Sequence, residues 1–186
     1  MFIQTEQTPN PATLKFLPGQ NVLESGTAYF PDPESAARSP LAQRLFAIDG
    51  VTEVFFGSDF ITIAKTEASE WYLLKPPILG IIMEHFASGA PALVEAPAAQ
   101  DGADEADEET DEVVLQIKEL LDTRVRPAVA QDGGDIVFRG FDRGVVYLHM
   151  QGACAGCPAS GATLKMGIEN MLRHYIPEVV EVRPVL

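Results

Sequence analysis

The sequence predicts an α+β protein, in which two small α+β domains are joined by an acidic, flexible linker rich in alanine and proline. Three observations support this class. The chain has 186 residues, of which 46% are hydrophobic, so it is long and apolar enough to form packed cores. Short segments in which apolar and polar residues alternate, as in strands, occur on both sides of the middle of the chain. Segments with apolar residues at helical spacing accompany them on both sides. The middle itself has almost no large apolar side chains. We therefore expect domains at residues 1–90 and 112–186, with the linker at 91–111.

The charge of the chain is unevenly distributed. The formal net charge is −14 at pH 7 and the pI is about 4.5, which argues against nucleic acid as a partner. Residues 91–112 contain nine acidic and no basic side chains, whereas residues 113–186 contain eight of each. Such an acidic stretch cannot bury enough apolar surface to offset the entropy of ordering it. We expect a solvated tether rather than a specific acidic docking motif.

No segment of the sequence predicts a membrane span or a targeting signal. No apolar run approaches the roughly 18 residues that a membrane helix needs. Residues 1–6 have neither a basic start with a long apolar stretch nor the Arg-rich pattern of an organellar presequence. The two cysteines lie too close together for a secreted disulfide framework. We expect no membrane partner and a reducing compartment: the bacterial cytoplasm, with the mitochondrial matrix as the alternative.

The first domain shows strand and helix signals in a mixed order. Ser39 is expected to cap the first helix, with Pro40 at its first position. His85 is expected at the surface of the second helix, and not as a metal ligand. The helices are predicted at residues 41–48 and 76–86, and the strands at 2–6, 12–17, 51–56 and 60–64, the last two forming a hairpin.

The second domain has the predicted order helix, hairpin, CxxC loop, helix, strand. The first helix is broken by residues 131–135, where two adjacent glycines permit backbone angles that other residues resist. The hairpin strands are predicted at 136–141 and 145–150, the second helix near Pro158 and the last strand at 179–185. The buried stripe of the second helix is expected to consist of Leu164, Ile168, Met171, Leu172 and Tyr175.

Both cysteines of the chain, Cys154 and Cys157, lie in the loop 152–158. Two intervening residues allow both sulfurs to converge on one centre. Because the loop leads into a helix, backbone N–H groups and the helix dipole should lower the thiol pKa values and favour the metal-binding thiolates. The small neighbouring residues leave room for a cluster and for a second subunit, and we expect the loop to be exposed.

Two thiolates do not complete a metal site, because structural zinc and iron–sulfur cubanes usually take four protein ligands. The residues allow four interpretations: a thiol–disulfide redox pair, a zinc site shared by a dimer, two inert buried cysteines, and an iron–sulfur cluster bridging two chains. The domain is short, no aromatic residue stands directly before the first cysteine, and small residues flank the pair, so we favour the bridging cluster. For His149 and His174 we expect ordinary structural roles.

The chain resembles the Nfu (NifU-like) family in both of its predicted domains. Residues 112–186 are similar to the C-terminal NifU-like domain, and residues 1–90 to the Nfu N-terminal domain. The matching segments are residues 5–13, 14–19, 131–135, 152–158 and 163–168. Together the two resemblances cover nearly the whole chain. The acidic linker is longer than the family leads us to expect.

The resemblance implies an iron–sulfur cluster carrier and not an enzyme. It implies a [4Fe-4S] cluster held between two subunits, with Cys154 and Cys157 of each subunit as ligands, and hence a homodimer when the cluster is bound. The cluster would come from an upstream scaffold and pass to apo-proteins, typified by lipoyl synthase and respiratory or aconitase-type proteins. The N-terminal domain would help to recognise these clients. The competing hypotheses are a redox enzyme that uses the same cysteine pair and a pure interaction module.

Overall fold

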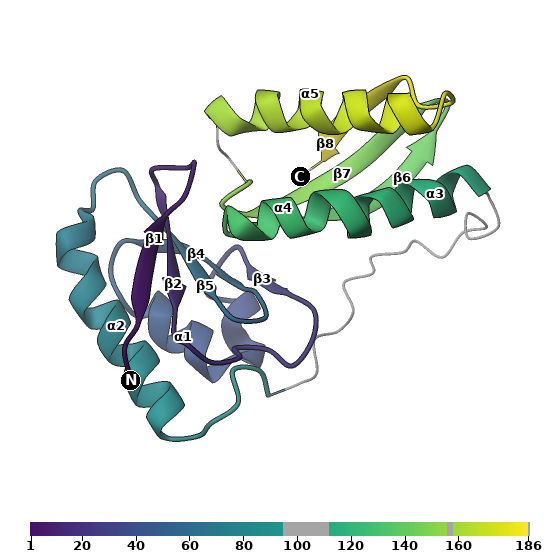
Figure 1. Ribbon diagram of the computed structural model, residues 1–186. Coiled ribbons are helices and arrows are strands. Elements are labelled where there is room, and N and C mark those ends of the chain that lie inside the picture. The colour runs from purple at the N-terminus through teal and green to yellow at the C-terminus, as the bar shows by residue number, and fades with distance from the viewer. Residues whose placement is uncertain (95–111, 156–157, 186) are drawn as a thin grey trace. The chain divides into compact units, whose positions relative to one another are not determined.

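The computed structural model describes residues 1–94, 112–155 and 158–185 (Figure 1). The chain separates into two compact units, Met1–Ala98 and Ala99–Leu186. Each unit combines helices with a β-sheet, which confirms the predicted α+β class. Most of the predicted linker, residues 95–111, lies outside the described residues. In the part of the chain that the structure describes, no helix is both long enough and apolar enough to cross a membrane.

The first unit is built on a five-stranded sheet with the order β1-β2-β5-β4-β3, in which all neighbouring strands are antiparallel. The predicted hairpin is confirmed as β4 and β5. The short strand β3 was not predicted, because three residues are too few to show an alternating pattern. The strands are β1 (Gln4–Gln7), β2 (Thr13–Leu17), β3 (Ala28–Phe30), β4 (Val51–Phe56) and β5 (Ile61–Lys65).

Within residues 1–94, the first unit also contains two α-helices and one 3-10 turn. They are η1 (Ser35–Arg38), α1 (Pro40–Phe46) and α2 (Trp71–Ala87). Ser39 caps α1 as predicted, since its hydroxyl accepts a hydrogen bond of 3.0 Å from the Ala42 N–H. Helix α2 begins five residues earlier than predicted, with Pro76 and Pro77 inside it. Leu74 and Ile78, one turn apart and both buried, extend its apolar face back toward Trp71.

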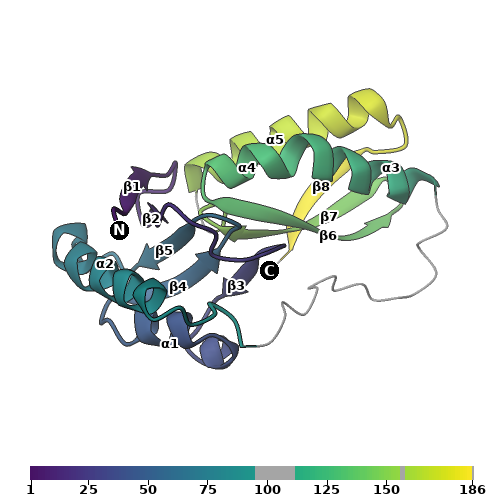
Figure 2. The ribbon, with the colours of Figure 1, turned by 60° about the horizontal axis from the view of Figure 1, so that its bottom comes forward.

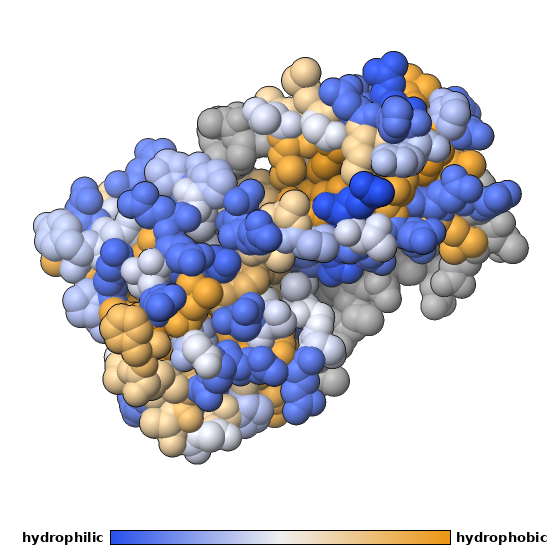
Figure 3. Space-filling model, in the orientation of Figure 1, coloured by the Kyte–Doolittle hydropathy of each residue, from blue (hydrophilic) through white to orange (hydrophobic). Residues whose placement is uncertain are grey.

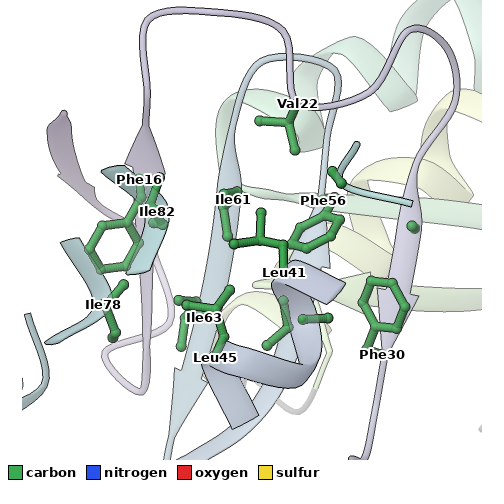
Figure 4. Close-up of a cluster of buried hydrophobic side chains, with 14 of the residues drawn as sticks. Phe16, Val22, Phe30, Leu41, Leu45, Phe56, Ile61, Ile63, Ile78 and Ile82 are labelled. Atoms are coloured by element: carbon green, nitrogen blue, oxygen red, sulfur yellow. The ribbon is translucent and has the colours of Figure 1, made fainter. Parts of the chain in front are cut away.

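The core of the first unit lies between one face of the sheet and the two α-helices (Figures 1 and 2). Figure 4 shows Leu41 and Leu45 of α1 facing Ile61 and Ile63 of β5. Phe30 and Phe56 pack edge to face beside them, with their ring centroids 5.2 Å apart. Burial of such a cluster is the main favourable contribution to folding of a domain of this size.

His85 is not a surface residue of α2, and this prediction is wrong. Its side chain is 2% exposed, because it continues the buried face that Leu74, Ile78 and Ile82 form along the helix. The sequence prediction failed because it treated His85 as a polar residue, although its spacing along α2 places it on the same face as the buried apolar residues.

The first unit also extends past the predicted boundary at residue 90. Ala92 is 6% exposed and belongs to the core, and its carbonyl oxygen accepts a hydrogen bond of 2.5 Å from the Ser39 hydroxyl. The Val94 N–H donates to the Arg38 carbonyl oxygen at 2.9 Å. Residues 91–94 therefore pack on the first unit and do not belong to a solvated linker. The hydrogen bonds to Ser39 and Arg38, together with the packing of Ala92 and Leu93 against the core, hold them there.

The second unit has a three-stranded sheet with the order β6-β7-β8. Strands β6 and β7 form an antiparallel hairpin, and β8 pairs in parallel with β7 after the chain crosses through α5. The predicted order of elements is confirmed. The elements are α3 (Glu112–Leu120), the π-helical turn η2 (Leu121–Val125), α4 (Arg126–Gln131), β6 (Gly134–Asp142), β7 (Val145–Gly152), α5 (Pro158–Tyr175) and β8 (Glu181–Val185).

Helix α5 and the α3–α4 run lie on the same face of this sheet (Figure 2). Their apolar side chains, among them Ile117 and Leu172, are buried against strand residues such as Leu148. Figure 3 shows apolar surface between α5 and the α3–α4 run. The prediction that Tyr175 belongs to the buried stripe is wrong, because its side chain is 48% exposed. Its ring instead lies 5.2 Å from the Arg124 guanidinium carbon, a cation–π arrangement at the surface.

Candidate metal centre

Cys154 lies in the turn that leads from the end of β7 at Gly152 toward the start of α5 at Pro158. This is the strand-to-helix position that the sequence predicts for the CxxC loop. The Cys154 side chain is 6% exposed and belongs to the core of the second unit. The expectation of an exposed loop is therefore wrong for this cysteine. Cys157 and its neighbour Gly156 lie outside the described residues.

Gly134, the first residue of β6, is the reason that Cys154 can turn inward. A Cβ atom at this position would lie 2.6 Å from the Cys154 Sγ and 2.7 Å from the Gln151 carbonyl oxygen. Both distances are shorter than any ordinary carbon contact, so no side chain larger than hydrogen fits. Gly134 is paired directly with Gly152 in the hairpin register, which brings the start of β6 against the cysteine loop.

The preceding residue, Gly133, has a different role. Its φ of +82° lies in the left-handed region, as the sequence predicts for a glycine that breaks a helix. Its carbonyl oxygen accepts a hydrogen bond of 3.2 Å from the Ala153 N–H. The segment 131–135 and the cysteine loop therefore form one structural unit. The sequence suggests both segments as motifs, but not their contact.

An ion pair between the buried Asp135 and the half-buried Arg126 fixes the glycine turn to the helix before it. Arg126 of α4 donates two hydrogen bonds to Asp135, from Nε to Oδ1 at 2.9 Å and from Nη2 to Oδ2 at 2.8 Å. Asp135 Oδ1 also accepts from the Ile136 N–H at 2.8 Å, and Arg126 Nη1 reaches Asp122 at 3.1 Å. These hydrogen bonds, first of all those to Asp135, raise the pKa of Arg126. A two-point contact of this kind holds its partners in one orientation.

Sequence reasoning missed Arg126. One signal could have found it: Asp135 lies between a glycine pair and an apolar strand, and a carboxylate buried there needs a cationic partner. Asp135 is 3% exposed, so its carboxylate does require a cationic partner.

Neither histidine of the second unit lies in the cysteine turn. His149 is half-buried on β7, and its Nδ1 is 3.3 Å from Arg139 Nη2 and 3.5 Å from Gln151 Nε2. Burial, followed by the nearby Arg139 charge, lowers the pKa of His149. His174 packs edge-on against Tyr175 near the end of α5. Within residues 1–94, 112–155 and 158–185, no three His, Cys, Asp or Glu side chains converge as a metal site.

The family comparisons match both units. Residues 3–89 match the family described as "Scaffold protein Nfu/NifU N terminal", and residues 117–183 match the "NifU-like domain". The human protein named "NFU1 iron-sulfur cluster scaffold homolog, mitochondrial" is 56% identical over 188 residues, which cover 100% of this chain and 72% of that protein. The protein of the same name from Drosophila willistoni is 58% identical over 187 residues, or 64% of its length.

These matches define a chain with an Nfu N-terminal domain followed by a NifU-like domain. The chain belongs to the Nfu family. It spans about two thirds of the length of these relatives, 64% of one and 72% of the other. A solution structure of a NifU-like protein from Saccharomyces cerevisiae is 28% identical, with a TM-score of 0.47, and covers 51% of this chain and 86% of that one.

Proposed function

We propose that this chain carries an iron–sulfur cluster as its cargo, bound between two copies through Cys154 and Cys157 of each copy. The cluster is of the [4Fe-4S] type and is passed to apo-proteins. The observation that carries the proposal is the glycine turn at Gly133 and Gly134, which is shaped around Cys154 in a chain of the Nfu family. A family of scaffold proteins gives no reason to propose catalysis, and we propose that the chain is not an enzyme.

The need for two copies follows from the number of thiols. The chain contains two cysteines, and a cubane cluster takes four protein ligands, so one chain supplies half of a site. The loop precedes the 18-residue helix α5, whose N-terminal end favours the negative charge of thiolates and of their cluster. A shared cluster then links the two chains, and its binding shifts the monomer–dimer equilibrium by mass action.

The residues around Cys154 orient the sulfur and do not themselves hold the cargo. The Ala153 N–H bond to Gly133 fixes the start of the loop, and the Arg126–Asp135 pair fixes the glycine turn to α4. A ligand held in this way has a defined direction before the cluster arrives. Such preorganisation lowers the entropic cost of binding.

The proposed partners are a second copy of the chain, an upstream scaffold that supplies the cluster and apo-proteins that accept it. The first unit has its own sheet and core, and we assign to it the recognition of the accepting proteins. The similar proteins are named mitochondrial, so they support the mitochondrial alternative and give no support to the bacterial cytoplasm.

Anaerobic reconstitution of the full chain tests the cluster proposal. The wild-type chain should bind four iron and four sulfide ions per dimer, and sedimentation should show a mostly monomeric apo form and a dimeric loaded form. Cys154→Ala and Cys157→Ala should each abolish cluster retention. Because Cys154 lies in the core, its variant should also lose some stability in the apo state, by about 1–2 kcal/mol.

The outcome separates this function from its competitors. A single cysteine variant that still holds a full cluster would overturn the arrangement with two ligands from each chain. A redox enzyme would form and break a disulfide between the two cysteines and bind no cluster. A pure interaction module would bind no cluster and form no disulfide. It would still bind its partners after either cysteine is replaced by alanine.

A second experiment tests the division of labour between the two units. Removal of residues 1–95 should leave cluster binding intact, because the second unit has its own core. Transfer to an apo-protein should become slower, since the tether no longer raises the local concentration of the client. The separate first unit added in trans is the matched control and should not restore the rate. Equal transfer rates with and without the tethered first unit would contradict the recruiting role.

A further inference from the structure

The first unit contains a buried histidine with one ring nitrogen that has no hydrogen-bond partner. His85 is 2% exposed, and among the described residues no group bonds its Nε2. The carbonyl groups of Ala90 and Pro91 face the imidazole and favour a proton on the ring. Since Nε2 has no partner among the described residues, we assign the ring proton to Nδ1. The Nδ1–H group then points to the carbonyls of Ala90 and Pro91. The imidazole is then neutral, and its bare Nε2 lies in the protein interior.

The carbonyls that face His85 belong to a segment that returns across the first unit. Residues 88–94, here called the strap, begin where α2 ends and reverse direction at Gly89, whose φ is +68°. The Ser88 hydroxyl donates to the His85 carbonyl oxygen at 2.6 Å. The far end of the strap is held by the Ser39 bond to Ala92 and by the Val94 bond to Arg38. His85 therefore faces the strap between its two anchored ends.

The charges near His85 oppose protonation. Arg44 of α1 is the cation that acts on the imidazole, and it is paired at 2.5 Å with Glu84 on His85's own helix. The strap contributes no titratable side chain, and the neighbouring positions of α2 that share the buried face are Ile78 and Ile82. Burial first, and then the Arg44 charge, lower the pKa of His85 below its ordinary value of 6.5. A proton on Nε2 would place a charged donor where the structure provides no acceptor.

We propose that the strap is an acid-sensitive latch, which neutral His85 holds closed against the first unit and protonated His85 releases. When the latch is closed, the chain leaves the first unit at Val94. When it is open, the chain leaves at Ser88 and the strap becomes part of the connection to the second unit. The latch thus sets the length of that connection without touching the cysteines. This inference does not depend on cluster binding.

The direction of the pH effect follows from the lowered pKa. A histidine whose pKa is lower in the closed form than in the open form stabilises the closed form at neutral pH. This contribution is lost as the pH falls from about 6.5 through the pKa of the closed form. Within that window, one proton taken up on opening raises the opening constant by up to about tenfold for each pH unit. Below the pKa of His85 in the closed form, the opening constant no longer changes with pH.

Amide hydrogen exchange of the full apo chain, followed by NMR between pH 7.5 and 5 and corrected for the intrinsic exchange rate, tests the latch. The Val94 amide, which bonds to Arg38 when the strap is closed, should lose its protection as the His85 ring titrates. The Ile63 amide in β5 should stay protected, which distinguishes opening of the strap from unfolding of the whole unit. The wild-type chain alone decides the question: protection of Val94 that does not change between pH 7.5 and 5 would overturn the proposal.

Two variants sharpen the test. In His85→Asn the side-chain amide replaces the Nδ1 donor but cannot gain a proton, so protection of Val94 should be the same at all pH values. His174→Asn removes an exposed histidine from the other unit and should behave as the wild-type chain does. A His85→Asn chain that keeps the full pH dependence would assign the effect to another group and overturn the role of His85. If that variant does not fold, coincidence of the His85 and Val94 midpoints in the wild-type chain remains the criterion.

Discussion

Replacement of Gly134 by alanine should disturb Cys154 directly. The added Cβ would meet the Cys154 Sγ at 2.6 Å, the Gln151 carbonyl oxygen at 2.7 Å and the Cys154 nitrogen at 3.0 Å. Ordinary contacts begin at 3.4 Å, so the loop must move by several tenths of an ångström. Two of the three atoms belong to the backbone, and the loop is also held by the Ala153 bond to Gly133, so a side-chain rotation cannot relieve the overlap.

The expected cost is that of an overpacked core, about 2 kcal/mol. For a unit of this size, such a loss lowers the unfolding midpoint by roughly 8–16 °C. Calorimetry of the full apo chain should show a lower transition for the second unit and an unchanged one for the first. After reconstitution, the variant should retain less iron than the wild-type chain, because its ligand is displaced from the direction that the glycine turn sets.

Gly140→Ala is the matched control on the same strand. Among the described residues, nothing lies within 4 Å of a Cβ added there, so the change in stability should stay within about 0.5 kcal/mol. The steric argument fails if Gly134→Ala matches Gly140→Ala in both its unfolding midpoint and its iron content.

Two further substitutions test the contacts that support the site and the strap. Arg126→Leu should destabilise the second unit by about 2 kcal/mol, because it leaves Asp135 buried without its cation, and should reduce iron retention after reconstitution. Ser39→Ala should destabilise the first unit by about 1–2 kcal/mol in chemical denaturation, because it removes both the cap of α1 and the bond to Ala92. Each has a control at an exposed position, Arg173→Leu and Ser58→Ala, for which changes below about 0.5 kcal/mol are expected.

Each of these two substitutions has an outcome that would contradict the structural interpretation. An Arg126→Leu chain as stable as Arg173→Leu would show that the two hydrogen bonds to Asp135 contribute little. A Ser39→Ala chain in which the Val94 amide keeps its full protection would show that the strap does not depend on the Ser39 hydroxyl.

Local patterns predicted most of the secondary structure. The period of apolar residues located α5, alternation located the hairpins, and the Ser39–Pro40 pair located the start of α1. These signals are local, because a helix or strand records its exposure in the spacing of a few neighbouring residues. The same signals failed for β3, which is too short, and for α2, where two prolines hid the true start.

The candidate site was predicted in part. The sequence placed both cysteines in one loop before a helix, and the structure confirms this place for Cys154. Its burial was not predicted, because it depends on the space that Gly134 leaves on a different strand. Arg126 was not predicted, because an arginine on a helix has the same pattern whether it faces solvent or a buried carboxylate.

Sequence patterns alone predict two units, most of the helices and strands in each unit, and the positions of the thiols along the chain. They do not predict β3. The tertiary structure sets which residues meet: Gly134 with Cys154, Arg126 with Asp135, and His85 with the strap. The reason is that periodicity depends on neighbours within a few positions, whereas these contacts join residues whose distance is set by strand register and helix packing. The buried carboxylate of Asp135, for example, accepts two of its hydrogen bonds from Arg126 on another element.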